Sequence, residues 1–217
     1  FSGTFNRFAR ELAQSWIDRY DIRHKRVVEI GCGQGEFLSL MAELGDNTCI
    51  GYDPALIPGR SQPPARGSLE LRAELVTDQT ALDADVILCR HTLEHIHRPL
   101  EFLRMLRRAG GSALLLIEVP DTKRVLDLGC FWDIFYEHCS YFCAASLRTC
   151  LRASGYEPLA TRLEFGGQYL IAEAAPSNAP AVVDDPADIL AAAERYREVA
   201  RRKIVDWTRF FDSAGPE

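Results

Sequence analysis

The chain has 217 residues, 47% of them hydrophobic and 26% charged, enough for one large globular domain, with or without an appendage, around a real core. Its formal net charge of −6 argues against nucleic acid as the main partner, because phosphate contacts need a basic surface. No apolar run approaches the roughly 18 residues of a spanning helix and no signal-peptide pattern opens the chain, so we expect no membrane partner.

The first predicted element is a helix that Ser2 or Thr4 can cap. Its aromatic and aliphatic residues recur at helical spacing and form one apolar face. Such a helix either lies across the mouth of a ligand site or covers the sheet, and packing is the usual role of this pattern. The face consists of Phe5, Phe8, Leu12, Trp16 and Tyr20.

A buried strand, a glycine turn and a helix are predicted next, with the strand at 26–30, the helix at 36–44 and Gly45 as its stop. The turn has the spacing G-x-G-x-G, whereas a dinucleotide-binding turn has G-x-G-x-x-G. Glu29, two residues before the first glycine, would repel a pyrophosphate. The pattern therefore favours a ligand without phosphates that carries hydroxyls and a positive charge, as S-adenosylmethionine does.

The next predicted strand, 48–52, ends in Asp53-Pro54, 18 positions after Gly35. An acidic side chain at this place can accept both hydroxyls of a ribose, although Asp-Pro at a strand end also forms ordinary turns. The proline- and glycine-rich residues 54–68 are predicted to be a loop, and 69–75 a third strand.

Residues 29–35 together with Asp53 resemble motifs I and II of the class I S-adenosylmethionine-dependent methyltransferases. The resemblance implies an α/β fold, a Rossmann-like seven-stranded, mostly parallel sheet with helices on both faces and an antiparallel last strand. It also implies S-adenosylmethionine as the cofactor, with Asp78 at the adenine amine. The cofactor-binding residues expected on this basis are Glu29, Gly31, Cys32, Gly33, Gln34, Gly35, Phe37, Asp53, Pro54, Asp78, Arg90, His91 and His95.

A nearly continuous apolar run at 84–89 predicts a buried parallel strand, followed by a helix that ends at Gly110-Gly111. Between them, residues 91–95 match H-x-x-E-H, a zinc-protease signature that needs a helix and a distant third ligand. The segment directly follows a strand, and its Leu-Glu-His-Ile-x-x-Pro pattern is similar to the loop that flanks the methionine part of the cofactor in small-molecule methyltransferases. The seven cysteines are scattered without a C-x-x-C pair, so we expect no metal site and a cytoplasmic protein.

A strand at 113–119 leads into residues 131–142, which are rich in aromatic and polar side chains. Aromatic clusters often cap a core, but this one also supplies Glu, His, Ser and Tyr at the carboxyl edge of the sheet. The segments Glu-Val-Pro at 118–120 and Tyr-Glu-His-x-Ser-Tyr-Phe at 136–142 are similar to the sugar C-methyltransferases, which methylate nucleotide-activated 4-keto deoxyhexoses. The family's Tyr-x-Glu-His motif has Phe135 at its tyrosine position here.

The resemblance predicts a small-molecule acceptor, with a nucleotide sugar as the leading candidate. We expect His138 to be the general base, Glu137 to orient it or share that role, and Tyr136 or Tyr141 to stabilise an enolate oxygen. Two alternatives remain open: an O- or N-methyltransferase of another small metabolite, and a non-catalytic cofactor-binding module.

The rest of the chain is predicted to contain a helix at 144–154 and two strands, near 157–163 and 169–174, that form an antiparallel hairpin. We therefore expect a methyltransferase domain at 1–174, a linker at 175–186 and an amphipathic helix at 187–217. The stripe of this helix is too apolar to face water alone. We expect it to pack on the main domain, on a second copy in a homodimer, or on a domain outside this chain.

Overall fold

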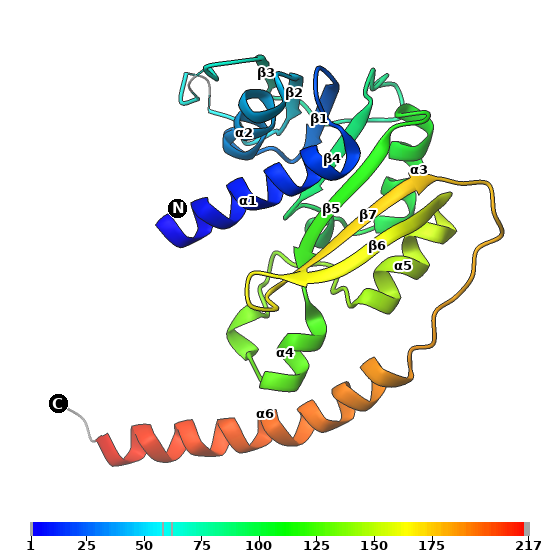
Figure 1. The fold of residues 1–217 in the computed structure, drawn as a ribbon. Helices are drawn as coiled ribbons and strands as arrows, with labels where there is room; N and C mark the ends of the chain where they lie inside the picture. Colours follow the sequence, from blue (N-terminus) through cyan, green and yellow to red (C-terminus); the bar gives the residue numbers. More distant parts are fainter. Residues whose placement is uncertain (1, 58, 62, 215–217) are drawn as a thin grey trace.

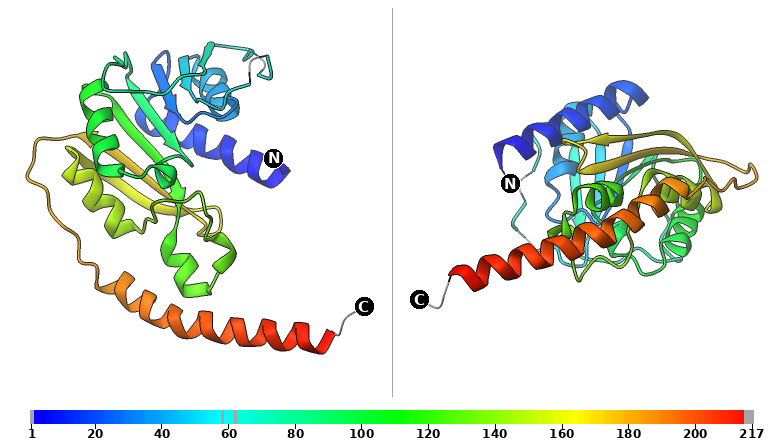
Figure 2. Two further views of the ribbon diagram at one scale, coloured as in Figure 1. Left: turned by 180° about the vertical axis from the view of Figure 1, so that it is seen from behind. Right: turned by 90° about the horizontal axis from the view of Figure 1, so that it is seen from below.

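The computed structural model describes residues 2–57, 59–61 and 63–214, and it shows one twisted sheet with helices on both faces (Figures 1 and 2). Its strands are β1 Arg26–Ile30, β2 Thr48–Tyr52, β3 Ser68–Arg72, β4 Val86–Arg90, β5 Leu114–Pro120, β6 Tyr156–Glu164 and β7 Tyr169–Pro176. Its α-helices are α1 Gly3–Tyr20, α2 Glu36–Gly45, α3 Pro99–Ala109, α4 Thr122–Leu128, α5 Ala144–Ala153 and α6 Ala187–Ala214. Two short 3-10 helices, η1 Leu93–His95 and η2 Phe131–Asp133, follow β4 and α4.

The seven strands lie in the order β3-β2-β1-β4-β5-β7-β6. β1 to β5 are parallel to one another, whereas β7 runs antiparallel to both β5 and β6. The strand order reverses between β1 and β4, and in open α/β sheets ligands bind outside the carboxyl ends of the strands at such a point. The predicted fold class is confirmed, including the antiparallel strand that comes last in the chain, β7.

Two apolar cores hold the helices to the two faces of the sheet. α1 and α2 pack on one face, where Trp16, Ile17 and Met41 are fully buried. α3 and α5 pack on the other face, where Leu106 and Leu147 are fully buried. Every residue of β4 is buried because this central strand is covered on both sides, which explains why its first four residues are all apolar.

A buried carboxylate on β7 fastens α1 to the sheet. Glu173, which has no exposed surface, accepts hydrogen bonds from Trp16 Nε1 at 2.9 Å and Tyr20 Oη at 2.6 Å. Arg19 donates to the same carboxylate at 2.9 Å, and Arg162 of β6 forms a further ion pair with it. Burial opposes ionisation of Glu173, but these donors outweigh it and lower the pKa of the carboxyl. The orientation of α1 therefore depends on the ionised carboxylate of Glu173.

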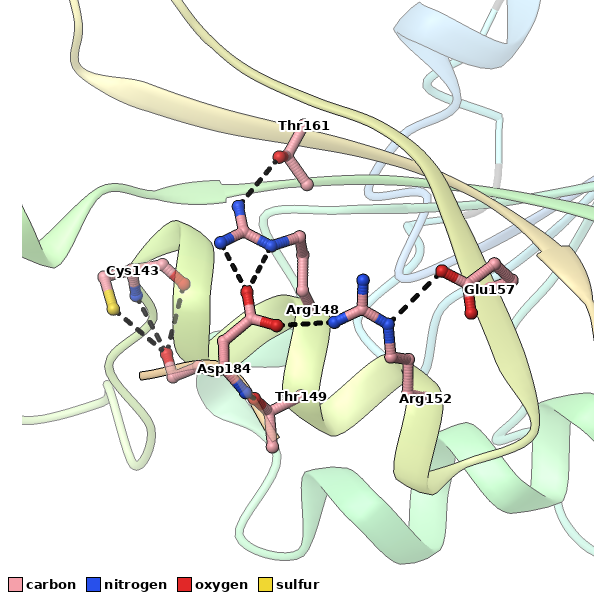
Figure 3. A network of polar contacts seen from close by, with 8 residues as sticks. Cys143, Arg148, Thr149, Arg152, Glu157, Thr161 and Asp184 are labelled. Atoms are coloured by element: carbon pink, nitrogen blue, oxygen red, sulfur yellow. Dashed lines mark hydrogen bonds and ion pairs between the residues drawn. The ribbon is translucent and has the colours of Figure 1, made fainter. Parts of the chain in front are cut away.

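A second ion-pair network holds the segment between β7 and α6 against α5 (Figure 3). Asp184 accepts hydrogen bonds from Arg148 Nε and Arg152 Nη1, each at 2.5 Å, and its backbone amide donates to Thr149 Oγ1 at 3.0 Å. The two arginines also reach the sheet, where Arg148 donates to Thr161 Oγ1. The predicted linker is therefore attached to α5 close to the linker's own C-terminal end.

α6 leaves the domain as a long, gently curved helix whose first half lies against α4 (Figures 1 and 2). Arg195 of α6 forms an ion pair with Asp127 of α4, and Lys203 lies 4.9 Å from the ring centroid of Trp132. Beyond these contacts the apolar stripe is exposed, as at Trp207 and Phe211. The partner expected on this stripe stays a prediction.

Three details differ from the sequence prediction. The third strand ends at Arg72 rather than at residue 75, and residues 74–76 instead line a cleft beside the sheet. The helix α4, whose N-terminus Asp121 caps through a bond from the Arg124 amide, was not predicted, since it has only seven residues. The last strand extends to Pro176, two residues into the predicted linker. Among the described residues, no helix is long and apolar enough to cross a bilayer.

The role of Glu173 can be tested with Glu173→Ala. The change leaves the buried indole N–H of Trp16 without an acceptor. It also removes the carboxylate that pairs with the guanidinium groups of Arg19 and Arg162. We expect the free energy of unfolding to fall by about 3–5 kcal/mol, and hydrogen exchange to accelerate more in α1 than in β1. Urea unfolding and amide exchange measure the two effects. Glu101→Ala, which removes an exposed pair with Arg98, should cost under about 1 kcal/mol; unchanged protection of α1 in Glu173→Ala would contradict this role.

Candidate functional site

A cleft of about 1420 Å³ opens at the carboxyl ends of β1, β2 and β4. The glycine turn after β1 forms its floor, residues after β2 and β3 form one wall, and the loop after β4 forms the other. α1 covers part of the mouth, so this helix both packs on the sheet and contributes to the site. Of the predicted cofactor-binding residues, the cleft is lined by Glu29, Gly31, Cys32, Gly33, Phe37, Asp53, Pro54, Arg90, His91 and His95.

Each glycine of the turn has a positive φ, but each is needed for a different further reason. At Gly31 a Cβ would lie 2.0 Å from Oγ1 of Thr92, so a side chain would collide with the β4 loop. At Gly35 it would lie 2.9 Å from the side chain of Leu71 on β3. At Gly33, with φ +57°, it would meet nothing within 4 Å and would project into open space beside the cleft. Gly33 is therefore the glycine of the turn that lines the cleft with open space where a side chain would be.

Asp53 connects the glycine turn to the end of β2. Its Oδ2 accepts a hydrogen bond from the Gly33 amide at 2.8 Å, and its Oδ1 accepts one from the Ala55 amide at 2.8 Å. A carboxylate has about four lone-pair sites, so two remain for hydroxyl donors in the cleft. Gln34 does not line the cleft but bonds to the backbone of Ala55 and Ile57, so it shapes the neighbouring loop.

Four ionisable side chains meet at the floor of the cleft: those of Arg90, Glu118 and Glu29 are buried, and that of His91 is partly exposed. Arg90 donates to Glu118 Oε2 at 2.6 Å and its guanidinium carbon lies 3.6 Å from the ring centroid of Phe37. His91 Nε2 lies 3.2 Å from Glu118 Oε1. Glu29, on the neighbouring strand β1, is 2% exposed, and its Oε2 has no hydrogen-bond partner among the described residues. The cleft thus has an unsatisfied acidic oxygen at its floor.

The charges of this cluster shift one another's pKa values. Burial raises the pKa of Glu29 to about 7, and the nearby charge of Arg90 only partly opposes it. Burial disfavours the charged form of His91, but Glu118 and Glu94 outweigh it and raise the pKa of the imidazole to about 9. Glu118 is also buried, yet His91 and Arg90 hold its pKa below the usual value. At neutral pH the Arg90–Glu118–His91 set is charged, while Glu29 is close to its midpoint.

The mouth of the cleft is lined by aromatic residues that the sequence analysis did not place there. Phe165 and Tyr169, on either side of the β6–β7 turn, have stacked rings with centroids 5.3 Å apart. Phe5 of α1 meets Phe165 edge to face at 5.9 Å, and His91 meets Tyr169 at 4.7 Å. The glycine pair at 166–167 was recognised as a turn, but only the fold shows that this turn reaches the cleft. The stacked rings of Phe165 and Tyr169 supply a flat apolar surface next to the imidazole of His91.

His138, the predicted base, lies beside the cleft next to His95. The ring centroids of these histidines are 4.9 Å apart, and His138 also contacts Phe135 and Tyr141 at 5.0 and 6.0 Å. Burial lowers the pKa of His138, with His95 adding to this and Glu94 opposing it, so the imidazole is neutral at pH 7. A neutral imidazole beside the cleft can accept a proton.

The backbone of η1 holds this segment in place. The carbonyl of Glu94 accepts hydrogen bonds from the amides of Cys139 at 2.8 Å and Ser140 at 3.0 Å. Ser140 Oγ donates to the carbonyl of Ile96 at 3.1 Å. These bonds join the loop after β4 to the loop after α4, although the loops are over 40 residues apart in the chain. Side chains from both loops can therefore act at one place.

Three predicted site residues lie elsewhere in the structure. Asp78 is exposed and forms an ion pair with Arg108 of α3, and the wall where it was expected is lined by Glu74, Leu75 and Val76. Tyr136 is 99% exposed. The side chain of Glu137 is exposed, although its backbone carbonyl accepts a hydrogen bond from His95 Nδ1 at 3.0 Å. Tyr141 lies at a small cavity with His138, so it is the tyrosine nearer the base.

Comparison with known proteins connects this geometry to a family. The family described as methyltransferase domain matches residues 5–161, which include the glycine turn, Asp53 and the segment with His138. The magnesium protoporphyrin IX methyltransferase of Synechocystis PCC 6803, solved with bound SAH, has a similar fold, with a TM-score of 0.63 and 17% identity over 80% of this chain and 84% of that one.

Curated relatives differ in the atom that they methylate. The ubiquinone biosynthesis O-methyltransferase of Pseudomonas aeruginosa (strain UCBPP-PA14) is 30% identical over 48% of this chain and 49% of its own length. The C-methyltransferase NovU of Streptomyces niveus is 27% identical over 92% of this chain and 49% of its own length. The chain therefore spans about half the length of these relatives.

Proposed function

The chain belongs to the methyltransferase-domain family, and on that premise we propose that it methylates a carbon atom of a small acceptor, a nucleotide-activated keto-deoxysugar, with S-adenosylmethionine as the donor. The observation that carries the proposal is His138, a neutral histidine fixed beside a cleft that has an acidic floor and a glycine turn. A carbon acceptor needs a proton removed next to its carbonyl group, and a histidine in this state suits that step.

The cleft fits S-adenosylmethionine at three points. The two free lone-pair sites of Asp53 can accept the ribose hydroxyls, because the other two are bound to backbone amides. The open backbone at Gly33 leaves room for the ligand to lie against the turn. The unpartnered Oε2 of Glu29 can receive a positively charged group. When bound, S-adenosylmethionine supplies an electrophilic methyl group, and the protein supplies alignment.

The residues that we propose for acid–base catalysis lie in the segment after α4. His138 takes the proton from the acceptor carbon next to the carbonyl, and Tyr141, which contacts His138, donates to the resulting enolate oxygen in exchange for its bond to the Phe135 carbonyl. Glu137 acts through its charge, since its side chain is exposed. The aromatic pair Phe165 and Tyr169 at the mouth can stack on a planar group of the acceptor, as a nucleotide base would require.

C-methylation is favoured over O-methylation by the extent of the match to each relative. The resemblance to NovU runs over 92% of the chain and includes residues 136–142, whereas the resemblance to the ubiquinone biosynthesis O-methyltransferase covers 48%. O-methylation of another small metabolite remains the second candidate, because that relative has the higher identity, at 30%.

Cofactor binding is tested by Gly33→Ala with Gly111→Ala as the matched control. Both glycines have φ +57° and open space where a Cβ would lie, so both substitutions should cost about 1–2 kcal/mol in backbone strain. Only the methyl group at residue 33 would occupy the cleft. We expect calorimetry to show at least a tenfold weaker affinity for S-adenosylmethionine in Gly33→Ala and an unchanged affinity in Gly111→Ala. Equal affinities in both variants would place the cofactor elsewhere.

The catalytic role is tested with 4-keto deoxyhexose nucleotides, labelled S-adenosylmethionine and NMR location of the methyl group. The loss of general-base help should lower kcat of His138→Ala about 10²–10⁴-fold. Affinity for S-adenosylmethionine should stay the same, because His138 does not line the cleft. Tyr136→Phe, a change at an exposed side chain of the same loop, should retain activity. Methylation at an oxygen, or full turnover by His138→Ala, would contradict the proposal.

A further inference from the structure

Three potential metal ligands meet where the loop after β4 touches the loop after α4. Glu94, His95 and His138 each offer one ligand atom, and these atoms all lie within 4.8 Å of one another. The H-x-x-E-H pattern at 91–95 failed as a zinc signature in the sequence because no third ligand was evident. The structure supplies His138, 43 residues after His95, and uses only Glu94 and His95 of the pattern.

We propose that Glu94, His95 and His138 bind one divalent first-row transition-metal ion of the Zn²⁺ type. Two imidazole nitrogens and a carboxylate oxygen are donors that such ions prefer. Three protein ligands also leave a fourth position open, as in zinc sites that bind water or a substrate oxygen.

The carboxylate of Glu94 points to a missing partner. Glu94 is 3% exposed, and its Oε2 has no hydrogen-bond partner among the described residues. Its other oxygen, Oε1, forms an ion pair with His91 at 3.8 Å from Nδ1, which is longer than a hydrogen bond, so this pair leaves Oε2 unsatisfied. A buried carboxylate oxygen without a donor is costly, and a bound cation would satisfy it.

The tautomer of His95 suits a metal ligand. Its Nδ1 lies 3.0 Å from the carbonyl oxygen of Glu137, and a carbonyl can only accept, so Nδ1 carries the proton. The lone pair of a neutral His95 is therefore on Nε2. Metal-bound histidines usually donate their second ring N–H to a carbonyl or carboxylate in this way, which fixes the ring.

The backbone keeps the ligands near one another without an ion. Glu94 provides a ligand atom and, through its carbonyl, accepts the amides of Cys139 and Ser140 directly after His138. Glu137 precedes His138 and receives the His95 bond. The two loops are therefore cross-linked on both sides of the ligands, so that side-chain adjustments suffice to close the site around an ion.

Metal binding has a consequence that rests on the proposed function. An imidazole nitrogen that binds a metal ion has no lone pair left to accept a proton. A bound ion would hence inhibit proton removal by His138, and removal of the ion would restore it. The same residue would serve as base in the metal-free protein and as ligand in the metal-bound protein.

The test is calorimetric titration of the chelator-treated protein with Zn²⁺ and absorption spectroscopy with Co²⁺. We expect one ion per chain, d–d bands of a low-coordinate Co²⁺ site, and no sulfur-to-cobalt charge-transfer band. Glu94→Gln and His138→Ala should each weaken binding at least tenfold. His138→Ala alters a half-exposed side chain, so it keeps the test valid if Glu94→Gln fails to fold.

The matched controls are His97→Ala and Cys139→Ser. Cys139 Sγ lies 3.5 Å from His97 Nδ1, so this exposed pair is the nearest competing site. Both controls should bind Zn²⁺ as the unaltered chain does. Absence of binding, or binding that disappears in Cys139→Ser with a sulfur-to-cobalt band in the unaltered chain, would overturn the proposal. Turnover by metal-free protein reports on the proposed function separately, because it requires no ion.

Discussion

The ion pair between Arg90 and Glu118 is the interaction on which the site depends. It joins the ends of β4 and β5 at 2.6 Å beneath the cleft, and it leaves Glu29 on β1 with a buried oxygen that no described residue satisfies. Because these groups lie at the point where the strand order reverses, the sheet itself places charge where its loops form a ligand site. A buried pair of this kind contributes little net stability but is costly to break, so it fixes the arrangement of the strand ends.

Much of the fold could be predicted from local patterns. The glycine spacing predicted the strand–turn–helix unit that the structure shows, because backbone requirements at these positions are strict and are visible in single residues. The strand at 84–89 was visible because a central parallel strand is apolar throughout. The short helix α4 and the early end of β3 were not visible, since seven helical residues, or the three residues 73–75, are too few to show a distinct periodicity.

The site residues that were missed depend on long-range contacts. Phe165 and Tyr169 reach the cleft only because β7 inserts antiparallel between β5 and β6, a pairing that no local pattern specifies. Asp78 was expected at the adenine, but the chain leaves the sheet after Arg72, and Asp78 reaches Arg108 instead. The closeness of His138 to His95 likewise depends on backbone bonds to the Glu94 carbonyl. Both proposals for His138, as a base and as a metal ligand, rest on that contact.

The affinity for S-adenosylmethionine as a function of pH tests the central claim, that Glu29 forms the acidic floor of the cofactor site. Its pKa is raised to about 7 by burial, and a cationic ligand prefers the ionised carboxylate. Affinity should therefore rise as pH is raised from about 5.5 towards 7, by up to about tenfold per pH unit, and then level off. Glu29→Gln should remove this rise. An affinity that is independent of pH in the unaltered chain, or a rise that persists in Glu29→Gln, would contradict the account.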